Sequence, residues 1–234
     1  MQERLDLRCQ SAHSLSDMTA ALERAAILHS IDLQIDHDRM LSRYGVLWML
    51  MRMRLTVKRF PEGEFTVQTF LRKPSSVASN RDFLLSDEKG EFGSAVQTWV
   101  LVHAAERRLA PMNTVPELQN GPFPQPERTS QLRRLILPQT APAALWTVTP
   151  DQIDSNGHLN NVHYIRHAEA LAPAGCTGLE IMFDRECFVG ETLRLESADC
   201  DSFFVRGVKE NGEESCEYRY IYENNAFPPE YFDA

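Results

Sequence analysis

The same order of predicted elements occurs twice in this 234-residue chain, and this repetition limits the folds that it can adopt. In each half a helix candidate precedes strand candidates that are joined by tight turns. A helix with one apolar stripe buries that stripe most readily against the apolar face of a sheet. The repetition therefore predicts two similar α+β units in tandem.

The first half opens with a helix predicted over residues 14–28. Ser14 and Asp17 have the spacing of a helix-capping box. Apolar residues then recur at helical intervals on one face, namely Leu15, Met18, Leu22 and Ala25. We expect this face to be buried against a sheet.

The strands of the first half follow this helix. Every odd position from Leu47 to Val57 is apolar, while Arg52 and Arg54 fall on even positions, which predicts a strand with one buried face. Further strands are predicted over residues 65–71, 81–85 and 95–102, with turns at 61–63 and 88–90.

The second half repeats this plan. A helix is predicted from Asn160 to about Leu171, with Asn160 as its cap. Strands are predicted over residues 179–188, 191–198, 202–209 and 214–223. The last two flank Asn211-Gly212, the strongest short hairpin signal in a sequence.

A segment with repeated prolines separates the halves. Residues 111–142 contain Pro116, Pro122, Pro124, Pro126 and Pro138, and proline neither donates to a strand ladder nor fits inside a helix. We therefore expect an N-terminal unit over residues 1–110, an extended linker over 111–142 and a C-terminal unit over 143–234.

Charge and composition exclude several classes of protein. A formal net charge of −9 argues against a nucleic-acid partner, and no apolar run reaches the ~20 residues that a membrane span needs. The charged N-terminus does not resemble an export signal. The five cysteines lack metal-ligand spacing, so reduced thiols in a cytoplasmic protein without a metal site are expected.

Polar residues are densest just before the second predicted helix. Asp154, Asn156, His158, Asn160 and Asn161 occur within eight positions, followed by Tyr164. Here the chain resembles the acyl-ACP thioesterases of the bacterial, double-hotdog type, whose second unit carries D-x-N-x-H, N-N and a tyrosine. The segment Phe183-Asp184-Arg185-Glu186-Cys187 resembles the family's R-E-C strand, in which the glutamate is functional.

Pieces of the first half extend this resemblance over about residues 12–223. They include Gly45-Val46-Leu47-Trp48, Arg81-Asp82-Phe83 and Trp99-Val100-Leu101. The chain departs from the family pattern at His103, where an aspartate is usual. The resemblance implies a tandem hotdog fold, in which each unit is a long helix wrapped by an antiparallel sheet, and hydrolysis of fatty acyl-ACP in fatty acid biosynthesis.

The resemblance implies a catalytic set of Asp154, Asn156, His158 and Glu186, and its chemistry needs no cofactor. Thioester hydrolysis requires an activated water, a donor for the oxyanion and a proton for the leaving thiol. His158 can move protons near neutral pH. Either Glu186 or Asp154 could orient its ring or act as the base, and Asn156 could bind the oxyanion or hold Asp154. The competing interpretation is an Asx-rich turn that only caps the helix.

Cys187 offers a second chemistry, because a thiolate beside histidine and asparagine resembles a papain-like set. Neighbours on a strand point to opposite faces, so Glu186 and Cys187 cannot both face His158. We expect Glu186 to face the histidine and Cys187 to pack inside.

The first half lacks these groups at the matching positions. Alignment places Gln10, Ala12 and Ser14 opposite Asp154, Asn156 and His158, and Arg59 opposite Glu186. One active site per chain is expected, with the first half holding the acyl chain. Substrate contacts are expected from Met18, Trp48, Met49, Met51, Asn160 and Asn161.

Acyl carrier protein is the expected partner, and a homodimer is compatible with the sequence. The carrier is acidic, so docking onto this acidic chain needs a local positive patch. The candidates are Arg52, Arg54, Lys58, Arg59, Arg107, Arg108, Arg128, Arg133 and Arg134. An acyl-CoA thioesterase of the same fold and a non-catalytic acyl-binding module are the alternative functions.

Overall fold

The computed structural model describes residues 2–124, 132–154 and 156–222. The first half contains β1 (Leu5–Cys9), α1 (Leu15–Asp32), α2 (His37–Tyr44), β2 (Val46–Val57), β3 (Phe65–Leu71), β4 (Ser79–Asp87), β5 (Gly90–His103) and β6 (Arg108–Ala110). The second half contains β7 (Ala141–Thr147), α4 (Asn161–Glu169), β8 (Cys176–Phe183), β9 (Thr192–Asp199), β10 (Phe203–Lys209) and β11 (Glu214–Tyr222). The α+β prediction is confirmed.

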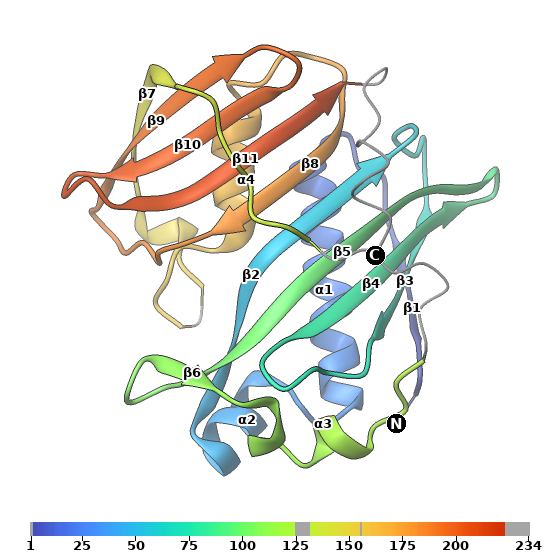
Figure 1. The fold of residues 1–234 in the computed structure, drawn as a ribbon. Helices are drawn as coiled ribbons and strands as arrows, with labels where there is room; N and C mark the ends of the chain where they lie inside the picture. The colour runs from blue at the N-terminus through green and yellow to red at the C-terminus, as the bar shows by residue number, and fades with distance from the viewer. Residues whose placement is uncertain (1, 125–131, 155, 223–234) are drawn as a thin grey trace.

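The strands form one continuous antiparallel sheet rather than two separate ones (Figure 1). Their order is β1-β3-β4-β5-β2-β8-β11-β10-β9-β7, with β6 paired to β5. The halves join where β2 pairs with β8, for example Leu55 opposite Leu179. Helices α1 and α4 lie on the same side of this sheet in Figure 1.

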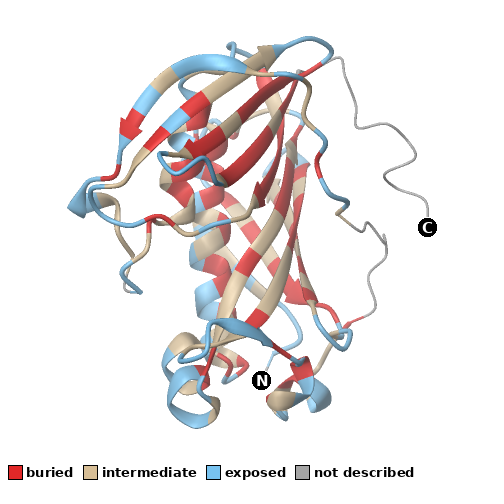
Figure 2. Ribbon diagram, turned by 60° about the vertical axis from the view of Figure 1, so that its left-hand side comes forward, coloured by how far each residue is buried: buried red, intermediate tan, exposed pale blue. Residues whose placement is uncertain are grey.

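The core fills the space between these helices and the sheet. Met18 and Leu22 of α1 pack in the same cluster as Ile165 of α4 and Tyr218 of β11. Buried residues alternate with more exposed ones along several strands (Figure 2). The buried stripe predicted for the first helix is confirmed, since Leu15, Met18, Leu22 and Ala25 are all fully buried.

The alternation predicted for the 47–57 strand is only partly right. Met53, Leu55 and Val57 are buried, but Leu47, Met49 and Met51 are only half-buried. A β-bulge between Leu50 and Arg52 is the reason, because it inserts one extra residue opposite β5. Leu50 pairs with Trp99 and Met53 with Gln97, so these two share one face, whereas Met49 pairs with Val100 on the other. The prediction that Met49 and Met53 share a buried face is wrong.

The arginines of β2 lie on the face away from the helices, as predicted. Arg54 is buried there against Glu180 of β8, with Nε donating to Oε1 over 2.7 Å. Arg52 donates to the carbonyl of Leu132 in the linker over 2.7 Å. Both side chains therefore hold the halves and the linker together.

Several elements were not foreseen. The edge strand β1 and helix α2 had no prediction, and β6 extends the hairpin of β5. The linker contains a 3₁₀ turn (Met112–Thr114) and the short helix α3 (Glu117–Asn120), which begins after Pro116. Proline fits this position because the first residues of a helix have no internal partner for their N–H groups. Pro126 and Arg128 lie outside the described residues, as does residue 223 of the last predicted strand.

The predicted strand over 179–188 ends early. The β8 strand stops at Phe183, because the amides of Asp184 and Arg185 both donate to the carbonyl of Ser215, over 2.8 and 3.1 Å. Residues 184–191 therefore form a loop that connects the end of β8 to β9. Helix α4 begins after Asn160, as predicted, and ends at Glu169.

The end of α4 stabilises the start of α1. The Glu169 carboxylate accepts bonds from the amides of Leu15 and Ser16 over 2.7 and 3.0 Å. Ser14 also caps this helix, accepting from the amide of Asp17 over 3.0 Å.

We expect Glu169→Ala to lower the free energy of unfolding by about 1–2 kcal/mol, because two amides and the positive end of the α1 dipole lose a carboxylate. Chemical unfolding measures this change. Glu62→Ala is the matched control, since its carboxylate is 82% exposed and pairs only with Lys89, and we expect a change below about 0.5 kcal/mol. Equal losses in the two variants would contradict a capping role.

Candidate active site

The loop before α4 is closed by Asp154. Its Oδ1 accepts from the amides of Asn156 and His158 over 2.8 and 3.1 Å, and its own amide donates to the carbonyl of His158 over 2.8 Å. Gly157 has φ +81°, a left-handed conformation that favours glycine at this turn. The local Asx turn that the sequence allowed is therefore present, and it fixes where the His158 side chain leaves the backbone. Ser155 lies outside the described residues.

The His158 ring faces the Glu186 carboxylate. Nδ1 of His158 lies 3.3 Å from Oε1 of Glu186, and their side chains are 21% and 29% exposed. The ring also contacts the edge of Phe188, with centroids 5.2 Å apart. Two residues from distant parts of the sequence thus form a partly buried pair that solvent can still reach.

The loop that carries Glu186 is anchored at several points. Lys209 of β10 donates to the carbonyl of Glu186 over 3.0 Å and pairs with Glu191 over 2.8 Å. The amide of Leu159 donates to the carbonyl of Cys187 over 2.9 Å, which ties this loop to the His158 loop. The relative position of His158 and Glu186 is therefore set by backbone contacts.

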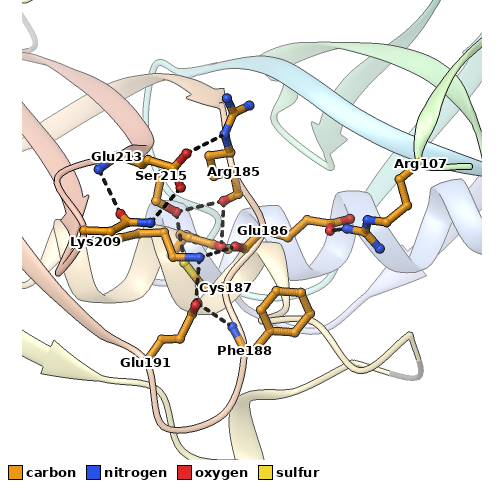
Figure 3. Close-up of polar contacts among 11 residues, drawn as sticks. Arg107, Arg185, Glu186, Cys187, Phe188, Glu191, Lys209, Glu213 and Ser215 are labelled. Carbon is orange, nitrogen blue, oxygen red and sulfur yellow. Dashed lines mark hydrogen bonds and ion pairs between the residues drawn. The ribbon is translucent and has the colours of Figure 1, made fainter.

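Glu186 and Cys187 point in opposite directions, as expected. Figure 3 shows Glu186 extending toward Arg107, while Cys187 is joined to Ser215. The Cys187 thiol is fully buried and lies 3.0 Å from the Ser215 hydroxyl. It packs in the core near Tyr164, and burial raises the pKa of that phenol well above its usual range. The Cys187 thiol is therefore a core side chain and is not exposed to solvent.

The surroundings of His158 favour its neutral form. Partial burial lowers the pKa of the His158 imidazole, Asp154 opposes this shift and Arg107 adds to it. The neutral form therefore persists below the ordinary titration near pH 6.5. A carboxylate only accepts hydrogen bonds, so the tautomer that suits Glu186 carries its proton on Nδ1 and leaves Nε2 free to take a proton.

Two side chains of the first half reach this site, and the sequence analysis did not assign either to it. Arg107, from the turn between β5 and β6, pairs with Oε2 of Glu186. Glu23 of α1 accepts from the Asn160 side chain over 3.1 Å. Burial raises the pKa of the Glu23 carboxyl, the Asn160 bond lowers it and the Asp154 charge raises it. The sequence does place a carboxylate at Glu23, directly after the buried Leu22. Residue spacing does not show, however, that Asn160 of the second half is its partner.

The remaining predicted site residues lie in different environments. Asn160 caps α4, its side chain accepting from the amide of Val162 over 2.8 Å, and Asn161 is half-buried as the first residue of that helix. Asn156 is exposed and its side chain donates to Asp154 over 3.4 Å. Met18 is fully buried, and Trp48 lies on the helix-facing side of β2, where its Nε1 donates to the carbonyl of Ile35 over 2.9 Å.

The matching positions of the first half have structural contacts instead. Ser14 caps α1, and Gln10 donates to Glu64 over 3.3 Å. Arg59, opposite Glu186 in the alignment, pairs with Asp87 through two bonds of 2.6 and 2.7 Å. None of these described positions holds a histidine paired with a carboxylate.

In the described ranges, no three or more His, Cys, Asp or Glu side chains are grouped so as to hold a metal ion. Within the same ranges, no helix combines the length and the apolar character needed to cross a membrane.

Comparison with known proteins identifies relatives along most of the chain. Residues 6–117 match the family model described as the acyl-ACP thioesterase N-terminal domain. A chloroplastic palmitoyl-acyl carrier protein thioesterase from Gossypium hirsutum is 27% identical over 236 residues, covering 87% of this chain and 56% of the relative. A chloroplastic oleoyl-acyl carrier protein thioesterase from Coriandrum sativum is 24% identical, covering 71% of this chain and 52% of the relative. The chain thus spans about half the length of these curated relatives.

Solved structures share the fold. An acyl-ACP thioesterase from Bacteroides thetaiotaomicron superposes with a TM-score of 0.84 at 20% identity, covering 94% of this chain and 97% of that one. The 12:0-ACP thioesterase from Umbellularia californica superposes with a TM-score of 0.80 at 16% identity and the same coverage. The predicted hotdog architecture is confirmed by these likenesses.

Proposed function

We propose that this chain, which matches the acyl-ACP thioesterase family model over residues 6–117, hydrolyses the thioester of a fatty acyl-acyl carrier protein and releases the free fatty acid and the carrier thiol. The observation that carries this proposal is the partly buried pair of His158 and Glu186, in which Nδ1 and Oε1 lie 3.3 Å apart. Such a pair can activate water, which is the central requirement of thioester hydrolysis without a covalent intermediate.

In the proposed reaction, Nε2 of His158 takes a proton from water as the water oxygen bonds to the thioester carbonyl carbon. Glu186 stabilises the imidazolium that forms, as a carboxylate does in other histidine-based sites. Collapse of the tetrahedral intermediate breaks the carbon–sulfur bond, and the imidazolium returns the proton to the leaving thiolate.

Asp154 acts on the loop rather than on the water in this proposal. Its Oδ1 already accepts two backbone amides, which fixes the turn that presents His158. Glu186 is the assigned partner of His158. The start of α4, with Asn160 and Asn161, supplies the positive end of a helix dipole near the developing oxyanion. Asn156 holds Asp154 from its exposed side.

The proposed place for the acyl chain is the helix-facing side of the first half. Met18 lies in the main core beneath α1, and Trp48 packs against a second cluster that contains Ile35 and Met40. Trp48 also meets Trp99 edge-on with ring centroids 6.5 Å apart. Met49 lies on the opposite face of β2, and Met51 is the extra residue of the bulge. These two methionines are therefore the weaker candidates for substrate contact.

We expect Trp48→Ala to raise the ratio of kcat/KM for long over short acyl-ACP by about tenfold, since the lost indole makes room for additional methylenes. Rates on two chain lengths give this ratio, and the ratio cancels any loss of folded enzyme. Met49→Ala is the matched variant on the other face and should leave the ratio unchanged. If Met49→Ala changed the ratio and Trp48→Ala did not, the acyl chain would lie on the face of β2 that carries Met49, and the proposed location would be wrong.

The substrate assignment is tested by measuring free thiol released from acyl-ACP and from acyl-CoA with the same acyl group. The proposal expects a higher kcat/KM on acyl-ACP. A preference for acyl-CoA would instead identify the alternative thioesterase, and no thiol from either substrate would identify a non-catalytic acyl-binding module.

The arginines named as docking candidates differ in how exposed they are. Arg54 is 5% exposed and held by Glu180, so it cannot meet a carrier. Arg107 and Arg108 are well exposed on the β5–β6 turn and remain candidates. A cytoplasmic location and a homodimer remain predictions from the sequence.

A further inference from the structure

The turn between β5 and β6 carries a side chain of the first half into the second. The turn is fixed by His103 pairing with Arg108 across the hairpin and by the amide of Arg107 donating to the carbonyl of His103 over 2.8 Å. Its first residue, Ala104, donates to the carbonyl of Gly45 over 2.9 Å, which holds the turn against the end of α2. The base of Arg107 is therefore well anchored although its side chain is 60% exposed.

The backbone of Arg107 is unusual for its residue type. Its φ is +51°, in the left-handed region that residues with a side chain rarely adopt. Such conformations persist where the surrounding contacts favour them, and they are frequent at functional sites. Here the conformation closes the turn that directs the guanidinium toward Glu186.

The two oxygens of Glu186 have separate partners. Oε2 pairs with the Arg107 guanidinium, and Oε1 lies 3.3 Å from Nδ1 of His158 (Figure 3). A carboxylate held at one oxygen loses rotational freedom at the other, so its distance to the imidazole is fixed before substrate binds.

We propose that Arg107 is a positioning residue for the hydrolysis, holding the Glu186 carboxylate against His158 so that the first half completes the site of the second. This inference rests on the proposed function, since it assigns Arg107 a part in the same reaction. Arg107 acts through Glu186 and touches neither the reacting water nor the thioester.

Other charged groups surround the His158–Glu186 pair. Asp154 faces His158 from its own loop, and Glu23 of α1 faces Asp154. Lys209 of β10 is bound to the Glu186 carbonyl and to Glu191. These groups remain in an Arg107 variant, so the change in charge there is that of one guanidinium.

Removal of the Arg107 charge raises the pKa of the His158 imidazole, because Arg107 lowers that pKa, while the larger lowering by burial remains. A base must be unprotonated to act, and the acid side of the rate profile therefore moves to higher pH.

The experiment compares Arg107→Gln and Arg107→Lys with Arg194→Gln as the matched control. Arg194 of β9 is also an exposed arginine in an ion pair, with Glu196 over 2.9 Å, and it is not among the docking candidates. We expect Arg107→Gln to lower kcat about tenfold on acyl-ACP with little change in KM, and to move the acid side of its pH profile to higher pH. Arg107→Lys should restore most of kcat, and Arg194→Gln should match the parent enzyme.

A raised KM with an unchanged kcat and pH profile in Arg107→Gln would overturn the proposal, because that pattern belongs to a residue that only docks the carrier. Arg107→Gly guards against misfolding, since glycine accepts the left-handed φ, and it should show the same pH shift as Arg107→Gln.

An NMR titration of the His158 imidazole separates this proposal from the proposed function. We expect the pKa of His158 to rise in Arg107→Gln even if no thioester is cleaved. An unchanged titration would refute the coupling, whereas a parent enzyme that releases no thiol would refute only the hydrolysis.

Discussion

Replacing His158 by alanine is expected to lower kcat for acyl-ACP hydrolysis by about 10²- to 10⁴-fold, the contribution that a positioned general base typically makes. The pair with Glu186 is lost, and no other described imidazole faces that carboxylate at ion-pair distance. Steady-state release of free thiol measures the effect.

The fold should survive this change. The bonds that shape the loop use the His158 backbone and the Asp154 carboxylate, and neither is removed with the imidazole. His163→Ala is the matched control, because this half-buried histidine lies on α4 and burial likewise lowers the pKa of its imidazole. A His158→Ala enzyme with near-normal turnover, or a His163→Ala enzyme that is equally impaired, would show that the site is assigned wrongly.

Glu186→Ala is expected to lower kcat by about 10²-fold or more, while Cys187→Ala retains most of the turnover. The carboxylate contacts both His158 and Arg107, whereas the thiol is buried against Ser215. Loss of the sulfur leaves a small cavity, so Cys187→Ala should instead lower the free energy of unfolding by about 1–2 kcal/mol.

Turnover and chemical unfolding of the same two variants separate these roles. An inactive but folded Cys187→Ala enzyme would support covalent catalysis through the thiol. Equal turnover in both variants would remove Glu186 from the mechanism.

Elements governed by local pattern were predictable from the sequence. The stripe of α1 and the hairpin at Asn211-Gly212 follow from side-chain periodicity and from backbone conformations that few residues adopt, and Gly212 does have φ +84°. The opposite directions of Glu186 and Cys187 followed from the parity of an extended chain, even though this segment is a loop.

Elements that depend on distant contacts were not predictable. The bulge in β2 results from pairing with β5 and β8, and no turn residue marks it. It reversed the predicted face of Met49. The edge strand β1 exists because β3 pairs with it, as Leu7 opposite Val67 shows, and its own five residues carry little signal.

In the candidate site, too, the residues close in sequence were predictable and the distant ones were not. Asp154, Asn156, His158 and Asn160 are close in sequence, and their types alone indicate a polar loop before a helix. Arg107 and Glu23 come from the other half of the chain and reach the site only because β2 pairs with β8 in a shared sheet. The contact between Arg107 and Glu186 depends on the length of the arginine side chain and on the left-handed backbone of the turn. Residue spacing in the sequence predicts neither the turn nor the contact.

The most direct test of the account is intact-protein mass spectrometry of acyl-ACP and enzyme in one incubation. We expect the carrier to lose the mass of its acyl group and keep its phosphopantetheine arm, the enzyme mass to stay unchanged throughout, and the conversion to stop in His158→Ala. A carrier that stays acylated with the parent enzyme, or an acyl group that accumulates on the enzyme, would contradict it.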